Sequence, residues 1–85
     1  MGLSFTINNK SDITFNVDPP SGVTAFQIPV AATSSAQDTV GDYKVDEYNN
    51  PDAKQFIVGL ATAASLSITH DNGSIKAATI VVTLT

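Results

Sequence analysis

The 85-residue sequence contains no cysteine and no arginine. Without cysteine, no disulfide can supplement the core, and no thiolate can act as a nucleophile or bind a metal ion. Without arginine, the chain lacks the planar side chain that recognises phosphate groups and guanine, and its formal net charge of −4 repels nucleic acid and anionic lipid. We therefore expect no nucleic-acid partner.

Long apolar runs are also missing. No segment is long enough to cross a membrane, so we expect no membrane insertion. The first residues form neither a basic region nor a continuous apolar stretch, so no signal peptide is expected and the location stays open, with a virion among the candidates. The length predicts one domain, residues 1–85, whose folding buries only about 60 to 65% of its unfolded surface. We expect modest stability unless a partner adds to the core.

Alternating apolar residues are the main pattern that is present. They occur first at Leu3, Phe5 and Ile7, and again at Ile13, Phe15 and Val17. This period of two predicts two half-buried strands. A loop with an odd number of residues around Asn9-Lys10-Ser11 would pair Ile7 with Ile13 in a first hairpin, and an arch between two sheets is the alternative.

Three further strands are predicted at residues 23–30, 39–48 and 53–61. Their inward residues are expected to be Phe26, Ile28 and Val30, then Tyr43 and Val45, then Phe56, Val58 and Leu60. Pro29 should place the end of the first of these strands at a sheet edge or in a bulge, because proline has no amide donor. Ile57 adds an apolar residue on the second face of the third, which predicts a central strand. Residues 31–38 are unpatterned and predict a long loop, with a short helix left open.

The C-terminal residues give the strongest local signal, because Asp71-Asn72-Gly73 separates two alternating runs. A three-residue loop with Gly73 as a left-handed bulge predicts a terminal hairpin that pairs Leu66 with Ala78. Its buried face would consist of Leu66, Ala78, Ile80, Val82 and Leu84. Its outer face would carry Thr79, Val81 and Thr83.

Val81 is the one apolar residue on that predicted outer face. We expect a second sheet layer or a partner to cover it. Exposure of Val81 in an isolated monomer would remove the best residue-level support for assembly.

Six or seven short strands without a convincing helix predict an all-β fold, a small antiparallel β-sandwich. In strand number and length it is similar to an immunoglobulin-like or fibronectin-like sandwich, or to a jelly roll. The cysteine pair and core tryptophan of true immunoglobulin domains are absent. The resemblance is therefore one of architecture alone.

Five of the eight acidic residues lie within fifteen positions: Asp38, Asp42, Asp46, Glu47 and Asp52. Calcium binds several carboxylate oxygens, so a calcium site is one interpretation. However, the spacing matches no calcium loop, and we predict a solvated acidic face with no metal and no cofactor. His70 is the only histidine and has no nucleophile motif beside it, so we predict no catalytic residues and no enzyme.

The remaining hypotheses concern binding. We predict a non-enzymatic structural or assembly protein, such as a small virion or capsid-decorating subunit that forms a homo-oligomer or binds a capsid. Its interface candidates are Val81, Thr79, Thr83 and Tyr48, the last as an exposed aromatic, although packing in the core or a turn is also open to it. The alternative is a lectin-like or adhesion module whose loops, residues 31–42 and 49–52, bind sugar or protein.

Overall fold

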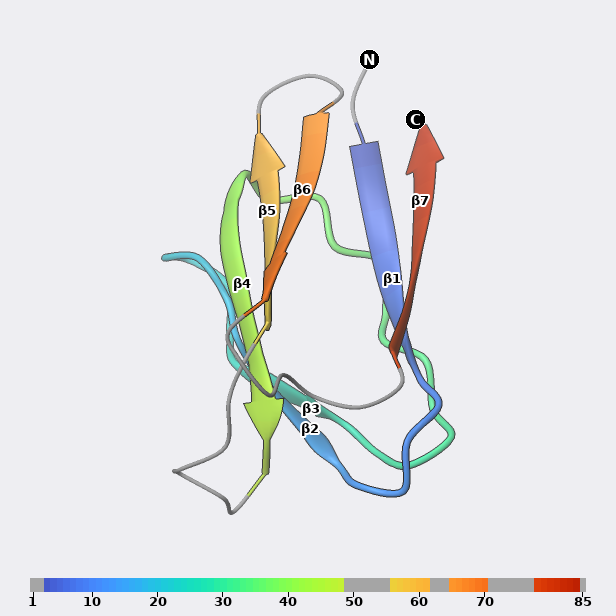
Figure 1. Ribbon diagram of the computed structural model, residues 1–85. Helices are drawn as coiled ribbons and strands as arrows, with labels where there is room; N and C mark the ends of the chain where they lie inside the picture. Colours follow the sequence, from blue (N-terminus) through green and yellow to red (C-terminus); the bar gives the residue numbers. More distant parts are fainter. Residues whose placement is uncertain (1–2, 49–55, 62–64, 71–77, 85) are drawn as a thin grey trace.

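A computed structural model describes residues 3–48, 56–61, 65–70 and 78–84 of the chain. These residues form seven strands in two antiparallel sheets and contain no helix (Figure 1), which confirms the predicted all-β sandwich. The smaller sheet pairs β1 (Leu3–Asn9) with β7 (Ala78–Leu84). The larger sheet has the order β3-β2-β4-β5-β6, with bounds Phe26–Ile28, Phe15–Asp18, Gly41–Glu47, Phe56–Ala61 and Ser65–His70.

The larger sheet follows the predicted pattern in its middle. β5 lies between β4 and β6, as expected for a strand with apolar residues on both faces. Tyr43 and Val45 point inward from β4, also as predicted. β3 is an edge strand that ends before Pro29, and it is shorter than the predicted 23–30, so Val30 lies beyond it and is exposed.

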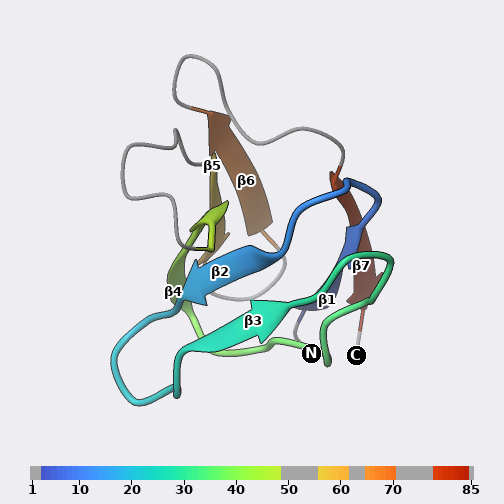
Figure 2. The same cartoon turned by 90° about the horizontal axis from the view of Figure 1, so that it is seen from below.

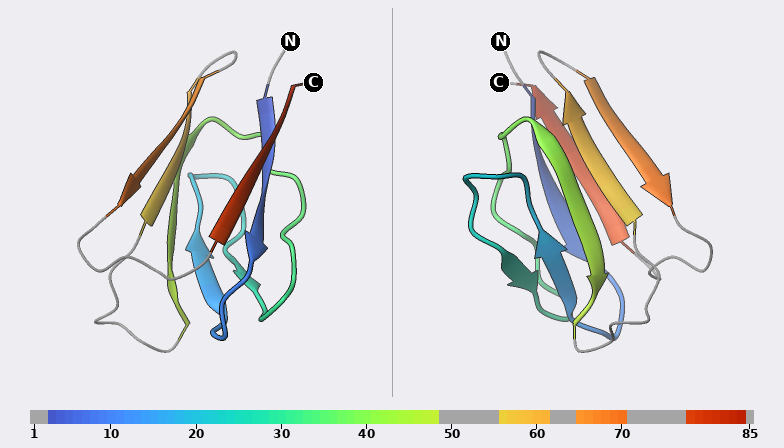
Figure 3. Two further views of the ribbon diagram at one scale, coloured as in Figure 1. Left: turned by 45° about the vertical axis from the view of Figure 1, so that its right-hand side comes forward. Right: turned by 90° about the vertical axis from the view of Figure 1, so that its left-hand side faces the viewer.

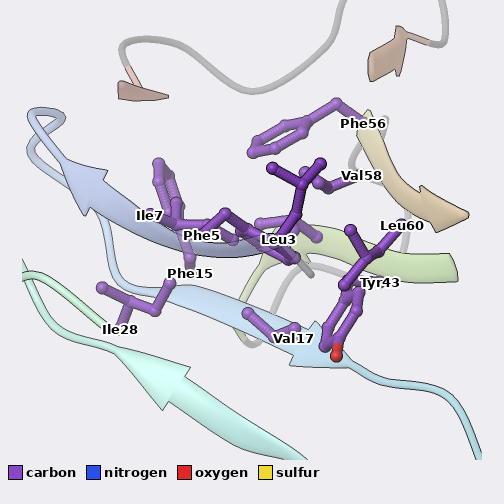
Figure 4. Packing of buried hydrophobic residues seen from close by; sticks show 11 residues of the cluster. Leu3, Phe5, Ile7, Phe15, Val17, Ile28, Tyr43, Phe56, Val58 and Leu60 are labelled. Atoms are coloured by element: carbon purple, nitrogen blue, oxygen red, sulfur yellow. The ribbon is translucent and has the colours of Figure 1, made fainter. Parts of the chain in front are cut away.

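The core lies between the inner faces of the two sheets (Figure 4). Its buried apolar members are Leu3, Phe5, Ile7, Phe15, Val17, Ile28, Tyr43, Val45, Phe56, Val58 and Leu60. Phe5 meets Tyr43 edge to face across the two sheets, with ring centroids 4.9 Å apart. This arrangement is one that aromatic pairs favour, and it joins the smaller sheet to the larger one.

The predicted first hairpin is wrong. β1 pairs with β7, whereas β2 pairs with β3 and β4, so Ile7 and Ile13 are not ladder partners. The chain arches from one sheet to the other after Asn9, which was the alternative. Both arrangements bury the same alternating side chains, and the arch does so by placing β1 and β2 in opposite layers.

The predicted terminal hairpin is also wrong. β6 pairs with β5, so that Leu66 is opposite Leu60, and β7 pairs with β1, so that Ala78 is opposite Asn9. The turn Asp71-Asn72-Gly73 lies outside the described residues. The inward positions of β7 are opposite those of β1 along its whole length, so the alternation of β7 is satisfied by a partner distant in the sequence.

Residues 32–37 lie within the predicted loop, and they run antiparallel along the second edge of β1 through two isolated bridges. The amide of Phe5 donates to the carbonyl of Gln37 at 3.0 Å, and the amide of Gln37 donates back at 2.8 Å. The amide of Ser34 donates to the carbonyl of Ile7 at 2.9 Å. β1 is therefore paired on both edges, whereas among the described strands β7 is paired only with β1.

A fully buried amide side chain holds the arch after β1. The Nδ2 of Asn9 donates to the carbonyls of Ile13, Ile28 and Pro29 at 2.7, 3.0 and 3.2 Å. Its Oδ1 accepts from both the amide and the hydroxyl of Ser11. Since buried polar groups must be hydrogen-bonded, this one side chain satisfies carbonyls of the arch and of the β3 end together.

Tyr43 anchors the start of β4 with its hydroxyl group. The hydroxyl donates to the carbonyl of Thr39 at 2.8 Å and accepts from the amide of Thr39 at 3.1 Å. This is the geometry of a tyrosine corner, a feature of β-sandwiches. Burial raises the pKa of Tyr43 above 10.0, the hydrogen bonds of Thr39 oppose the rise, and the charge of Asp38 adds to it.

We expect Asn9→Ala to lower the free energy of unfolding by about 3 to 4 kcal/mol, because it removes all the hydrogen bonds by which this fully buried side chain links the arch to the end of β3. Urea denaturation measures the loss. Asn16→Ala on the outer face of β2, where the side chain is only partly buried, is the matched control and should cost less than about 1 kcal/mol. Equal losses in the two variants would contradict the role of Asn9.

The raised pKa of Tyr43 predicts a loss of stability in alkali. In the unfolded chain the phenol loses its proton at lower pH than in the folded chain, so the contribution is complete below about pH 10 and is lost as the pH rises further. Tyr43→Phe should weaken this dependence and cost about 1 kcal/mol at neutral pH through the lost hydrogen bond. Denaturation of both proteins between about pH 8 and 11 tests this, and parallel profiles would refute it.

Candidate functional site

The structure places Thr79, Val81 and Thr83 together on the outer face of β7, where all three are exposed. Val81 is 50% exposed, so no described strand forms a second layer over it, and the support expected from that residue alone is lost. Tyr48 follows β4 and is 47% exposed, while its amide donates to the carbonyl of Thr14. Tyr48 is therefore on the surface but belongs to the other sheet.

The inner face of β7 has a less expected property. Val82 is opposite Phe5, and Ile80 is opposite Ile7, so both point to the core side of the smaller sheet. Ile80 packs against the core, but Val82 is 45% exposed. An apolar side chain on the inner face is thus only half covered.

β6 shows the same property at the edge of the larger sheet. Ile68 is opposite the fully buried Val58, so it too points to the inner face, yet it is 44% exposed. Leu66 is opposite Leu60 and packs partly against the core. The inner face of the larger sheet therefore extends beyond what the smaller sheet covers.

The two half-covered strands lie at the same side of the sandwich (Figures 2 and 3). β3 and residues 32–37 are at the opposite side (Figure 2). β6 and β7 belong to different sheets and do not pair with each other. We name this side, formed by β6 and β7, the open side.

The backbone of β7 directs hydrogen-bonding groups to the open side. Successive residues of a strand point their amide and carbonyl groups to opposite edges, and the odd-numbered residues of β1 use theirs on residues 32–37. The even-numbered residues therefore point to β7, where Thr6 is opposite Val81. Ile80 and Val82 consequently direct their amide and carbonyl groups away from β1, toward the edge of β7 that no described strand pairs with, which we call the free edge.

The strands at the two sides differ in how well their edges are protected from pairing. β3 is three residues long and is followed by Pro29, and both features discourage a further strand. β6 and β7 have six and seven residues, and neither contains proline, lysine or an acidic residue. Within their described residues, β6 and β7 thus carry none of the sequence features that discourage strand addition.

The acidic residues lie elsewhere. Asp42 is exposed on β4, Asp46 is partly buried on the same outer face, and Asp38 is exposed before this strand. Among the described residues, no group of three or more histidine or acidic side chains could hold a metal ion. Asp52 lies outside the described residues, and His70 is the last residue of β6.

Two of the residues that define the open side were not foreseen as a site. The sequence predicts burial for Val82, and the alternation along β6 places Ile68 on the same inner face as Leu66. Their exposure depends on how the edges of the two sheets lie relative to each other, and this depends on pairing between distant segments. In the part of the chain that the structure describes, no helix is long and apolar enough to span a membrane.

No protein-family model, curated protein or solved structure matches the chain.

Val45 is fully buried and Val82 is half exposed, so shortening each side chain to alanine should lower the free energy of unfolding by different amounts. Val45→Ala should cost about 2 to 3 kcal/mol, because Val45 is fully buried. Val82→Ala should cost less than about 1 kcal/mol in dilute solution, since half of the side chain is already in water. Chemical denaturation of the two variants measures the difference, and equal costs would show that Val82 is covered.

Proposed function

We propose that this chain is a non-enzymatic structural or assembly protein that works by associating with neighbouring protein chains through its open side. The observation that carries the proposal is the half-exposure of Ile68 and Val82 on the inner faces of the two strands that form the open side. Covering such residues is favourable by about 25 cal/mol for each Å² of apolar surface removed from water. A strand of a neighbouring chain would supply both that cover and partners for the free backbone groups.

The narrower form of this proposal is a small virion or capsid-decorating subunit. A protein of 85 residues has a small core, and association would add the burial that its size limits. The absence of lysine and acidic residues from β6 and β7 also permits a neighbouring strand to approach them. The lectin-like alternative has less support, because much of the backbone of residues 32–37 is used in pairing with β1.

We expect the purified chain to form a defined oligomer at micromolar concentration. Its thermal midpoint should rise with protein concentration, because association stabilises the folded state by mass action. Light scattering and thermal unfolding at several concentrations measure the two effects. A strictly monomeric and highly stable species would count decisively against the proposal.

A lysine at the open side should disrupt this association, since natural sheet edges use lysine to prevent pairing. We expect Val82→Lys to shift the protein to monomer. Gln27→Lys is the matched control, because Gln27 is an exposed residue on the protected edge strand β3. The control should keep the mass of the unsubstituted protein, and dissociation of both variants would argue against an interface at the open side.

A further inference from the structure

We infer that the free edge of β7 pairs antiparallel with β7 of a second copy, about a two-fold axis at Val81. This rests on the function proposed above and names the partner and the register. The occupant is a second copy because three features of β7 fit an identical strand: its charge, its pattern of faces and the direction of its backbone groups.

The charge distribution permits two copies to meet at this edge. The chain carries a formal net charge of −4, so self-association through a charged face would be opposed by repulsion. β7 contains no charged residue. Asp42 and Asp46 are on the outer face of the larger sheet, which faces away from the smaller sheet (Figure 2). Contact along β7 therefore keeps these acids of the two copies apart.

The face pattern restricts the register. Residues directly opposite each other in an antiparallel pair lie on the same face, so an inward residue must be opposite an inward residue. A two-fold axis at Val81 places Ile80 opposite Val82 of the second copy, and both are inward. It also matches all seven residues of the strand, from Ala78 to Leu84, which shifts of two residues in either direction do not.

The backbone agrees with this register. Ile80 and Val82 direct their amide and carbonyl groups to the free edge, and they would form the hydrogen-bonded pairs of the new ladder. Val81 would be opposite Val81 of the second copy at a pair without hydrogen bonds. Residues in such pairs have Cα atoms only about 4.5 Å apart, so the two valine side chains would be in contact.

The outer face then becomes self-complementary. Thr79 would be opposite Thr83 of the second copy, and facing threonines form favourable cross-strand pairs. Val81, the one apolar residue on this outer face, would be covered by Val81 of the second copy. The dimer therefore covers the residue that the isolated chain leaves half exposed.

The added strand also widens the smaller sheet at the open side. β7 is the last described strand of a sheet that is narrower than the one it faces. A second β7 beside it would bring further inward apolar residues to the side where β6 lies (Figure 2). Ile68 of β6 is half exposed. The contact between the two β7 strands would then cover apolar side chains of both β6 and β7.

The absence of cysteine makes this register directly testable. Val81→Cys should form a disulfide-linked dimer under mild oxidation, because the Cα separation of about 4.5 Å in such a pair is within disulfide range. Thr83→Cys is the control, since it is exposed on the same face of the same strand but would be opposite Thr79. We expect cross-linking at least about tenfold faster for Val81→Cys, measured on non-reducing gels.

A mixture of Thr79→Cys and Thr83→Cys proteins provides a second readout that leaves Val81 intact. It should cross-link between the two variants, whereas each variant alone should not. If the unsubstituted protein is oligomeric but Val81→Cys links no faster than Thr83→Cys, the register and the β7 contact are wrong while the proposed function stands. If the unsubstituted protein is monomeric, the proposed function fails and the dimer fails with it.

Discussion

The packing of β1 against the larger sheet is the contact on which the rest of the structure depends. Leu3, Phe5 and Ile7 are all buried, and they are the only apolar residues of the smaller sheet that the described core buries this deeply. For these side chains to be excluded from water, β1 must have a neighbouring segment on each edge within the smaller layer. Residues 32–37 cover one edge and β7 covers the other, so β7 itself is left at the margin.

Burying β1 in this way requires the chain to arch into the opposite sheet without leaving buried carbonyls unpaired. Asn9 performs this task because it continues the inward alternation of β1 but carries an amide where the previous inward residues carry hydrocarbon. Its donors reach the arch and the end of β3, which lie 4 to 20 residues away in the sequence. A polar residue at the last inward position thus links the crossover to the edge of the other sheet.

The sequence predicted which face each strand buries more reliably than which strand is its neighbour. The prediction that Ile80 and Val82 point inward is correct. Their alternation is compatible with β1 or with β6 as the neighbouring strand, since apolar residues alternate with the same period in both. The local turn signal favoured the nearer partner, and the pairing of the first and last strands overrode it. The exposure of Ile68 was beyond prediction for the same reason, because it depends on the number of strands in each sheet.

The difference between the edges of this molecule is a stronger argument for association than any single exposed residue. A general tolerance of open edges would leave β3 unprotected as well, yet β3 is short and is followed by Pro29. β6 and β7 are longer, contain no lysine or acidic residue, and carry Leu66, Ile68, Ile80 and Val82 at inner-face positions. Because a chain of 85 residues has a small core, covering the exposed apolar side chains of those strands would add to the stability of the fold.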